Sequence, residues 1–172
     1  ADLPNVKQIV VVGGGPASVP RLDTLLAAEN EGAAPARTCA DEVAYWLYSS
    51  GTTGMPKGTM HVHGNPRVMA QAAGQRRLGY REDDVVFSAA KLFFSYGLGN
   101  ALICPMWVGA TSVFYPERPT PQTVFEMLRG YQPTMFFAVP TLYAAMLADP
   151  ECKSEKLPGR LRLCFSAGEP LQ

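Results

Sequence analysis

Short apolar runs alternate with segments of helical periodicity, and this order predicts an α/β fold with a mainly parallel sheet flanked by helices. The chain has 172 residues, which is enough for one domain with a buried core. Its composition, 47% hydrophobic and 17% charged, is that of a globular protein rather than a disordered one. We expect right-handed crossovers between the parallel strands.

The first fifty residues predict two strands and one helix. An apolar run at residues 6–12 predicts a strand that ends at three consecutive glycines. Residues 21–29 carry leucines at helical spacing, and residues 43–49 predict a buried strand. The small, polar segment 30–37 between them is the best candidate for a linker.

After residue 60 the pattern alternates regularly. Pro121 suits the first turn of a helix, and Gly130 is expected to end that helix. The predicted helices cover residues 66–78, 98–108, 120–128 and 141–147, and the predicted strands cover residues 84–88, 110–115, 135–139 and 161–166.

The segment YSSGTTGMPKG, residues 48–58, has the composition of a polyphosphate-binding loop. Glycines let backbone N–H groups approach an anion, hydroxyls add neutral donors, and Lys57 supplies a charge. The spacing differs from the common P-loop, because Lys57 follows Pro56 and precedes Gly58. A flexible surface loop is the alternative. The stiffening by Pro56 and the position after a strand favour phosphate binding.

Residues 49–58 resemble the phosphate-binding signature of the adenylate-forming superfamily, which includes acyl- and aryl-CoA synthetases, peptide-synthetase adenylation domains and luciferases. The resemblance implies that the chain is part of the large N-terminal domain of an acyl-CoA synthetase-like fold. It further implies ATP, Mg²⁺ and coenzyme A as the cofactors or co-substrates. The residues implied in binding the ATP phosphates are Ser49, Ser50, Gly51, Thr52, Thr53, Gly54 and Lys57.

A second stretch, residues 88–100, is rich in aromatic residues and glycine. Phe93, Phe94 and Tyr96 are too close in sequence to share one helical face. Core packing accounts for some of them, but such a wall also suits a flat aromatic acid. The stretch resembles the benzoate-CoA ligase branch, which implies that Ser95, Tyr96 and Gly97 line an aryl pocket. Ser95 stands where that branch is expected to have alanine, and its hydroxyl offers a contact for a hydroxyl or amino substituent.

A third stretch, SAGEPL at residues 166–171, is a turn of small residues after a strand. Taken alone it is an ordinary strand-to-helix turn, with Glu169 near a helix N-terminus. The resemblance implies that Gly168, Glu169 and Pro170 contact adenine. It also implies that Ser166 and Ala167 form the floor of the acid pocket.

The resemblance implies that residues 1–172 are a partial AMP-binding (adenylation) domain, with no second complete domain and without the small C-terminal domain of the family. The Tyr-Gly-x-Thr-Glu motif, the ribose-binding aspartate and the catalytic lysine of the family are expected outside this segment. We therefore expect no catalytic residue within the chain. We also expect no release of pyrophosphate when the chain alone is given benzoate and ATP.

Two other functions are compatible with parts of the sequence. An NAD-binding oxidoreductase domain would use the glycines at 13–15, but Ser18 replaces the third glycine of that fingerprint and Pro16 interrupts the turn. A non-catalytic scaffold would keep the fold without the chemistry. Parallel titrations with ATP and NAD would separate the first two functions.

Charge and composition exclude other partners. Fifteen basic and fifteen acidic residues give a net charge of zero, which argues against a nucleic-acid surface. No apolar run is long enough to cross a membrane. His61 and His63 lack a third ligand at suggestive spacing, so we expect no metal site formed by protein side chains alone. The four cysteines have no paired spacing and are typical of reduced thiols in a cytoplasmic protein.

Overall fold

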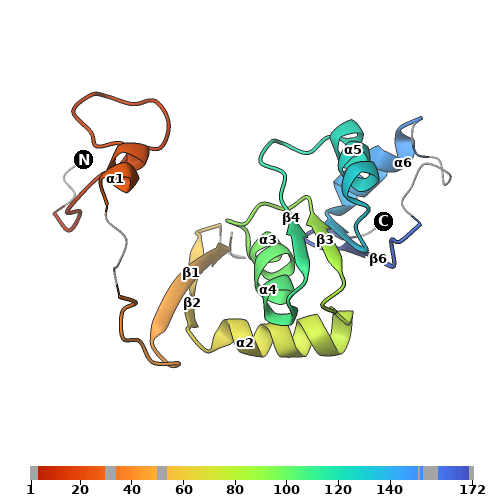
Figure 1. Cartoon of the computed structure of the whole chain (residues 1–172), viewed down its shortest axis with the longest axis horizontal. Coiled ribbons are helices and arrows are strands. Elements are labelled where there is room, and N and C mark those ends of the chain that lie inside the picture. Colours follow the sequence, from red (N-terminus) through yellow and green to blue (C-terminus); the bar gives the residue numbers. More distant parts are fainter. Residues whose placement is uncertain (1–3, 30–33, 50–53, 151, 153–158, 171–172) are drawn as a thin grey trace. The chain divides into compact units, whose positions relative to one another are not determined.

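The strands form a two-stranded hairpin and a separate four-stranded sheet (Figure 1). The computed structural model describes residues 4–29, 34–49, 54–150, 152 and 159–170. The chain divides into two units, Ala1–Arg37 and Thr38–Gln172, and the boundary falls at the end of the predicted linker.

The first unit contains one helix, α1 (Leu22–Ala28), as the leucine spacing predicts. The predicted strand at residues 6–12 is wrong. Only Val11 pairs, through a single parallel bridge with Arg21, and its N–H donates to the Pro20 carbonyl at 2.9 Å. An extended segment becomes a strand only beside a partner, and the described part of this unit offers one residue for pairing. No described side chain of this unit is buried.

The second unit begins with an antiparallel hairpin, β1 (Val43–Ser49) and β2 (Lys57–Val62). The predicted bounds of β1 are confirmed, but its predicted burial is wrong. Trp46 is 51% exposed and Tyr48 is 73% exposed, while Tyr45 and Leu47 on the other face are half-buried. Among the described residues β1 pairs with β2 alone, and Trp46 and Tyr48 on its outer face remain exposed.

The four-stranded sheet is entirely parallel, in the order β4-β3-β5-β6 (Figure 1). This confirms the predicted α/β class. Because β3 lies between β4 and β5, the strand order reverses there, and the crevice at the carboxyl ends of such strands is where α/β proteins bind ligands. The strands are β3 (Val85–Ser88), β4 (Thr111–Val113), β5 (Met135–Ala138) and β6 (Leu163–Ser166).

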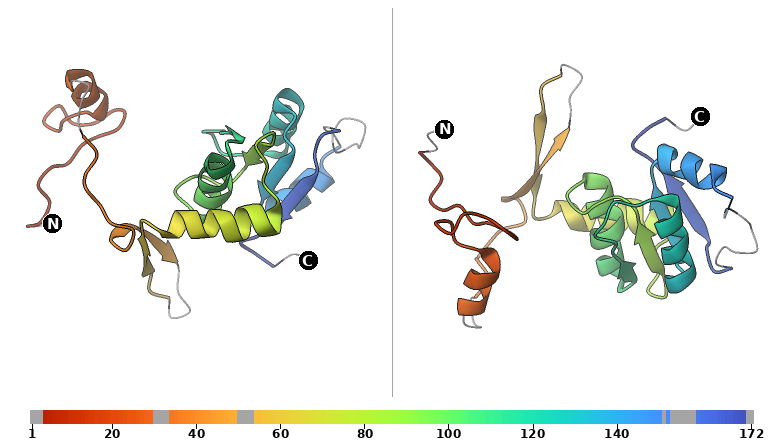
Figure 2. Two further views of the ribbon diagram at one scale, coloured as in Figure 1. Left: turned by 60° about the horizontal axis from the view of Figure 1, so that its bottom comes forward. Right: turned by 90° about the horizontal axis from the view of Figure 1, so that it is seen from above.

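Helices cover both faces of this sheet (Figure 2). The predicted helix at 120–128 extends further, because Gly130 lies inside it and Gln132, with φ of 48°, caps it instead. The helical segments are α2 (Asn65–Met69), the π-helical η1 (Ala70–Leu78), α3 (Ser95–Gly97), the π-helical η2 (Leu98–Ile103), α4 (Cys104–Val108), α5 (Pro121–Tyr131) and α6 (Pro140–Ala148). None of the described helices is long and apolar enough to span a bilayer.

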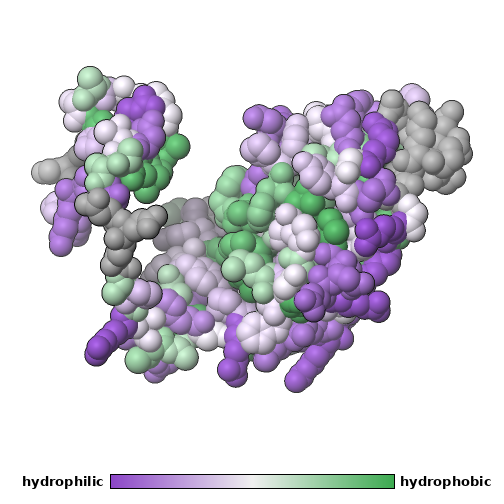
Figure 3. Space-filling view, viewed as in Figure 1, coloured by the Kyte–Doolittle hydropathy of each residue, from purple (hydrophilic) through white to green (hydrophobic). Residues whose placement is uncertain are grey.

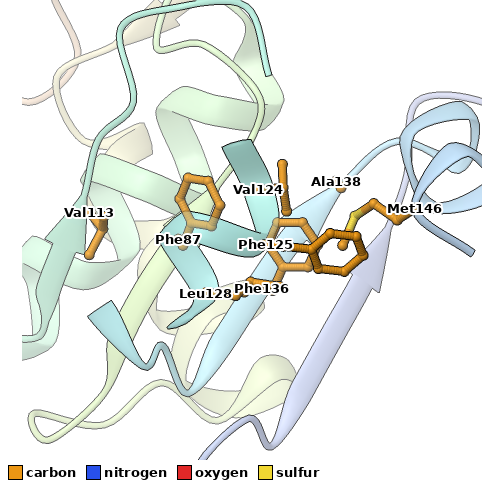
Figure 4. Packing of buried hydrophobic residues seen from close by; sticks show 8 residues of the cluster. All are labelled: Phe87, Val113, Val124, Phe125, Leu128, Phe136, Ala138 and Met146. Atoms are coloured by element: carbon orange, nitrogen blue, oxygen red, sulfur yellow. The ribbon is translucent and has the colours of Figure 1, made fainter. Parts of the chain in front are cut away.

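Alternating strand residues supply the two halves of the core. Phe136 faces α5 and α6, where it packs with Phe87, Phe125 and Met146 (Figure 4). The next residue, Phe137, belongs to the cluster on the opposite layer, which includes residues of η1, α3 and α4. This period of two, with both faces apolar, is typical of a central parallel strand.

A buried carboxylate connects three segments at the amino ends of the parallel strands. Asp84, 2% exposed, accepts hydrogen bonds from Arg162 Nε at 2.9 Å and from Thr134 Oγ1 at 2.6 Å. Burial opposes ionisation of Asp84, but the hydrogen bonds from Arg162, Thr134 and the Arg81 N–H outweigh it, so the pKa of Asp84 is lowered. The ion pair thus joins the segments before β3, β5 and β6, away from their carboxyl ends.

Candidate functional site

A cavity of about 450 Å³ lies between the hairpin and the helical segments that follow β3. Its lining is mostly apolar, with a few polar side chains, as is typical of small-molecule sites. The lining residues are Tyr45, Leu47, His61, Asn65, Met69, Ser95, Tyr96, Leu98, Gly99, Asn100, Ile103, Ala167 and Gly168. The structure therefore brings Ser95, Tyr96, Ala167 and Gly168, predicted from two separate stretches, to one cavity.

Tyr96 lines this cavity with its ring, while its hydroxyl is used elsewhere. The hydroxyl lies 2.9 Å from the Phe165 carbonyl oxygen and 3.3 Å from that of Ala138, and donates to these acceptors. Burial raises the pKa of Tyr96. Tyr96 thus fastens α3 to the carboxyl ends of β5 and β6 and fixes the distance between two walls of the cavity.

Gly97 shapes the same turn without lining the cavity. A Cβ at this position would lie 2.1 Å from the Lys91 carbonyl oxygen and 2.6 Å from that of Ala90. No side chain fits such a gap, so glycine is required for residues 90–94 to fold back against α3. The predicted contact of Gly97 with the ligand stays a prediction, and the structure adds a role in shaping the loop.

The turn after β6 serves two cavities. Ala167 and Gly168, with φ of 96° at Gly168, line the first cavity, whereas Ser166 does not. The Ser166 Oγ is buried and has no hydrogen-bond partner among the described residues. Glu169 and Pro170 instead line a second cavity of about 280 Å³ against α6, with Pro140, Thr141, Tyr143, Ala144 and Leu147. The predicted adenine-contacting residues therefore lie at the junction of the two cavities.

The predicted phosphate loop joins β1 to β2. Ser49 and Lys57 face each other as the last pair of the hairpin, and both are exposed. Gly54 has φ of 79°, which favours glycine. The predicted contacts of Ser50, Gly51, Thr52 and Thr53 lie outside the described residues. The site is thus at the tip of an antiparallel hairpin, not at the end of a parallel strand as the buried-strand interpretation implies.

The predicted aromatic wall is divided. Phe93 and Phe94 lie against each other, with ring centroids 4.4 Å apart, and are 75% and 57% exposed. They line a third hollow of about 820 Å³, together with Lys91 and Arg118, and not the cavity that contains Tyr96. Figure 3 shows apolar surface gathered over the middle of the second unit, at the position of α3 in Figure 1.

Sequence reasoning missed the residues that close the cavity from the hairpin side. Tyr45 and His61 are cross-strand partners whose rings stack at 4.9 Å, and Asn65 Nδ2 lies 3.3 Å from His61 Nδ1. The residues that line the cavity alternate along β1, and this period of two is the signal that could have found them. No group of three or more potential metal ligands occurs in the described part of the chain.

Comparison with known proteins decides the family. A model of the AMP-binding enzyme family matches residues 1–172. The chain belongs to the AMP-binding enzyme family. This confirms the resemblance to adenylate-forming enzymes and favours it over the NAD-binding alternative.

Relatives in this AMP-binding family include CoA ligases of aromatic acids. The chain is 71% identical to the 4-hydroxybenzoate–CoA/benzoate–CoA ligase of Rhodopseudomonas palustris, over 99% of this chain and 32% of that protein. It is 54% identical to the benzoate–CoA ligase of Thauera aromatica, over 98% of this chain and 32% of that protein. The chain thus spans about a third of the length of these relatives.

Solved AMP-binding structures share the fold. A benzoate CoA ligase from Burkholderia xenovorans LB400 is 44% identical, with a TM-score of 0.81 over 95% of this chain and 32% of that chain. The anthranilate CoA ligase AuaEII, in complex with anthranoyl-AMP, is 38% identical, with a TM-score of 0.88 over 98% of this chain and 33% of that chain. The fold is therefore that of part of an acyl-CoA synthetase-like domain.

Proposed function

We propose that the chain is a partial adenylation domain of an ATP-dependent aryl-CoA ligase that activates benzoate or a hydroxy- or aminobenzoate. The observation that carries this proposal is the cavity of about 450 Å³ lined by Ser95, Tyr96, Ala167 and Gly168. Its mainly apolar lining suits a flat ring, and its walls come from the stretches that resemble the acid-binding segments of benzoate-CoA ligases. The names of the relatives, benzoate and 4-hydroxybenzoate ligases, support the same class of acid.

The proposed reaction has two balanced steps. A carboxylate oxygen attacks the α-phosphorus of ATP, the bond to the bridging oxygen breaks, and pyrophosphate leaves with that electron pair. The thiol sulfur of coenzyme A then attacks the acyl carbon and loses its proton, and AMP leaves as the thioester forms. In such reactions the protein mainly positions the reactants and stabilises developing charge.

The nucleotide would lie along the hairpin tip and the turn after β6. Lys57, exposed opposite Ser49, fits a role as the point charge for the β- and γ-phosphates. Ser50, Gly51, Thr52, Thr53 and Gly54 complete the proposed cradle. Gly168, Glu169 and Pro170 are proposed to contact adenine, with the apolar cavity beside α6 fitting the flat base. Mg²⁺ bound together with ATP would offset part of the negative charge of the phosphates.

The acid would lie in the cavity of about 450 Å³, where Ser95 is proposed to meet a ring substituent. Ser95 is exposed to the cavity, while Tyr96 offers its ring face. Gly97 and Ser166 are proposed to shape this pocket from behind the lining. We place the enzyme in the cytoplasm, where ATP and coenzyme A are available; the four free cysteines support a reducing compartment.

A substrate panel on the full-length enzyme that carries this segment tests the proposal. Benzoate, hydroxybenzoates, aminobenzoates and acetate are each supplied with ATP, Mg²⁺ and coenzyme A. Pyrophosphate release and thioester formation are then measured. We expect turnover with one or more aromatic acids and little with acetate. Turnover of acetate alone would overturn the aryl assignment, and no turnover of any acid would favour the non-catalytic scaffold.

A further inference from the structure

Three polar side chains meet where the hairpin closes the cavity of about 450 Å³. His61 on β2 stacks on Tyr45 of β1, with centroids 4.9 Å apart and ring planes 7° apart. Asn65, at the start of α2, reaches the same imidazole from its edge, with its Nδ2 3.3 Å from His61 Nδ1. All three residues line the cavity. Contacts from two elements therefore hold the imidazole in one orientation.

The contact with Asn65 favours one of the two neutral tautomers of His61. An amide nitrogen only donates hydrogen bonds, so Asn65 Nδ2 donates and His61 Nδ1 accepts. The neutral imidazole then carries its hydrogen on Nε2. Nε2 has no hydrogen-bond partner in the part of the chain that the structure describes. In that tautomer His61, which lines the cavity, has an N–H that no described residue accepts.

The position of His61 along the hairpin determines which end of a ligand it meets. The last pair of the hairpin is Ser49–Lys57, at the proposed phosphate site, and His61 pairs with Tyr45 four residues further along. At about 3.3 Å per residue, His61 lies roughly 13 Å along the strand from that site. An aromatic acid whose carboxylate points to the nucleotide therefore presents its distal ring edge, not its carboxylate, to this donor.

We propose that His61 determines specificity by donating its Nε2–H to the hydroxyl oxygen of a 4-hydroxybenzoate ring. The inference rests on the proposed function, because it needs the carboxylate to face the nucleotide. Benzoate leaves the donor without a partner, and a site built to hydrogen-bond a substituent discriminates against an analogue that lacks it.

The test compares two acids in the full-length ligase that carries this segment. The kcat/KM for 4-hydroxybenzoate is divided by the kcat/KM for benzoate, in the wild type and in variants at position 61. We expect His61→Ala to lower this ratio about tenfold, as the loss of one hydrogen bond predicts. His61→Gln retains an N–H donor and should keep most of the preference.

His63→Ala is the matched control, because His63 is exposed and does not line the cavity. We expect it to leave the ratio unchanged. An unchanged ratio in His61→Ala, which includes an equal loss of activity with both acids, would overturn the inference. An equal effect of His63→Ala on the ratio would also overturn it. Failure of the proposed function is distinguishable, since the wild type would then form no thioester from either acid.

Discussion

The β1–β2 hairpin and the parallel sheet are built from similar apolar and aromatic runs, but they bury them very differently. Every residue of β5, Met135–Ala138, is buried, because helices cover both faces of the sheet. In β1, Val43–Ser49, only alternate residues are half-buried, and these are the ones that face the ligand cavity. The sheet supplies the framework, and the hairpin supplies the proposed phosphate loop and one wall of the cavity.

The largest difference should appear when one aromatic ring is removed from each region. Phe136→Ala should lower the free energy of unfolding by about 3–5 kcal/mol, because a fully buried ring leaves a cavity in the core. Trp46→Ala should cost about 1 kcal/mol or less, since half of that side chain is exposed. Urea unfolding of both variants measures the contrast. Equal losses would mean that the hairpin is as tightly packed as the sheet.

The second test concerns charge at the amino ends of the strands. The pKa of Asp84 is lowered in the folded state by Arg162 and Thr134 despite burial, so its contribution is fully present above the unfolded pKa of about 3.9. The contribution is lost as pH falls through the folded pKa. Asp84→Asn should cost about 1.5–3 kcal/mol near neutrality and should flatten the loss of stability below about pH 4.

Asp23 provides the control for that measurement. It pairs with Arg21 at 2.6 Å, but both side chains are well exposed. Asp23→Asn should therefore leave stability near neutral pH almost unchanged. Unfolding by urea at several pH values compares the two variants. A pH profile of Asp84→Asn that matches the wild type below pH 4 would show that the buried ion pair does not govern acid sensitivity.

The third test is backbone space in the loop that carries Ser95 and Tyr96. Gly97→Ala should destabilise by about 1–3 kcal/mol, because the new methyl group would overlap the Lys91 carbonyl. Gly130→Ala is the matched control: a Cβ there meets nothing within 4 Å, and its position inside α5 favours alanine by up to about 1 kcal/mol. Thermal unfolding should move in opposite directions. A shift of the same sign in both would refute the role assigned to Gly97.

The comparison also shows what the sequence can predict. The strands of the sheet were predictable because buried parallel strands are short apolar runs between helical segments, as at residues 135–139. Residues 6–12 show the same apolar character yet form no strand, because pairing depends on a partner that composition does not reveal. The burial of β1 was overestimated for the same reason: a covering layer is a property of the tertiary fold.

In the candidate site, too, some residues were predictable from sequence motifs and others depend on the tertiary fold. Ser95, Tyr96, Ala167 and Gly168 were predictable from motifs, and the fold brings them together. His61 was noticed only as a possible metal ligand, since its contacts with Tyr45 and Asn65 depend on strand register and on the start of α2. Phe93 and Tyr96 are close in sequence but line different hollows, because the turn at α3 sends their side chains apart.

The smallest effect on stability is expected at the hairpin tip, where the effect on function should be clear. Lys57 is exposed, so Lys57→Ala should change the free energy of unfolding by about 0.5 kcal/mol or less. In the full-length ligase it should raise the KM for ATP more than the KM for the acid, because the charge is proposed to meet the β- and γ-phosphates. Lys7→Ala, in the first unit and also exposed, is the control and should alter neither constant. If Lys57→Ala changed only the KM for the acid, the hairpin tip would belong to the acid site. The hairpin would then not supply the phosphate site proposed for it.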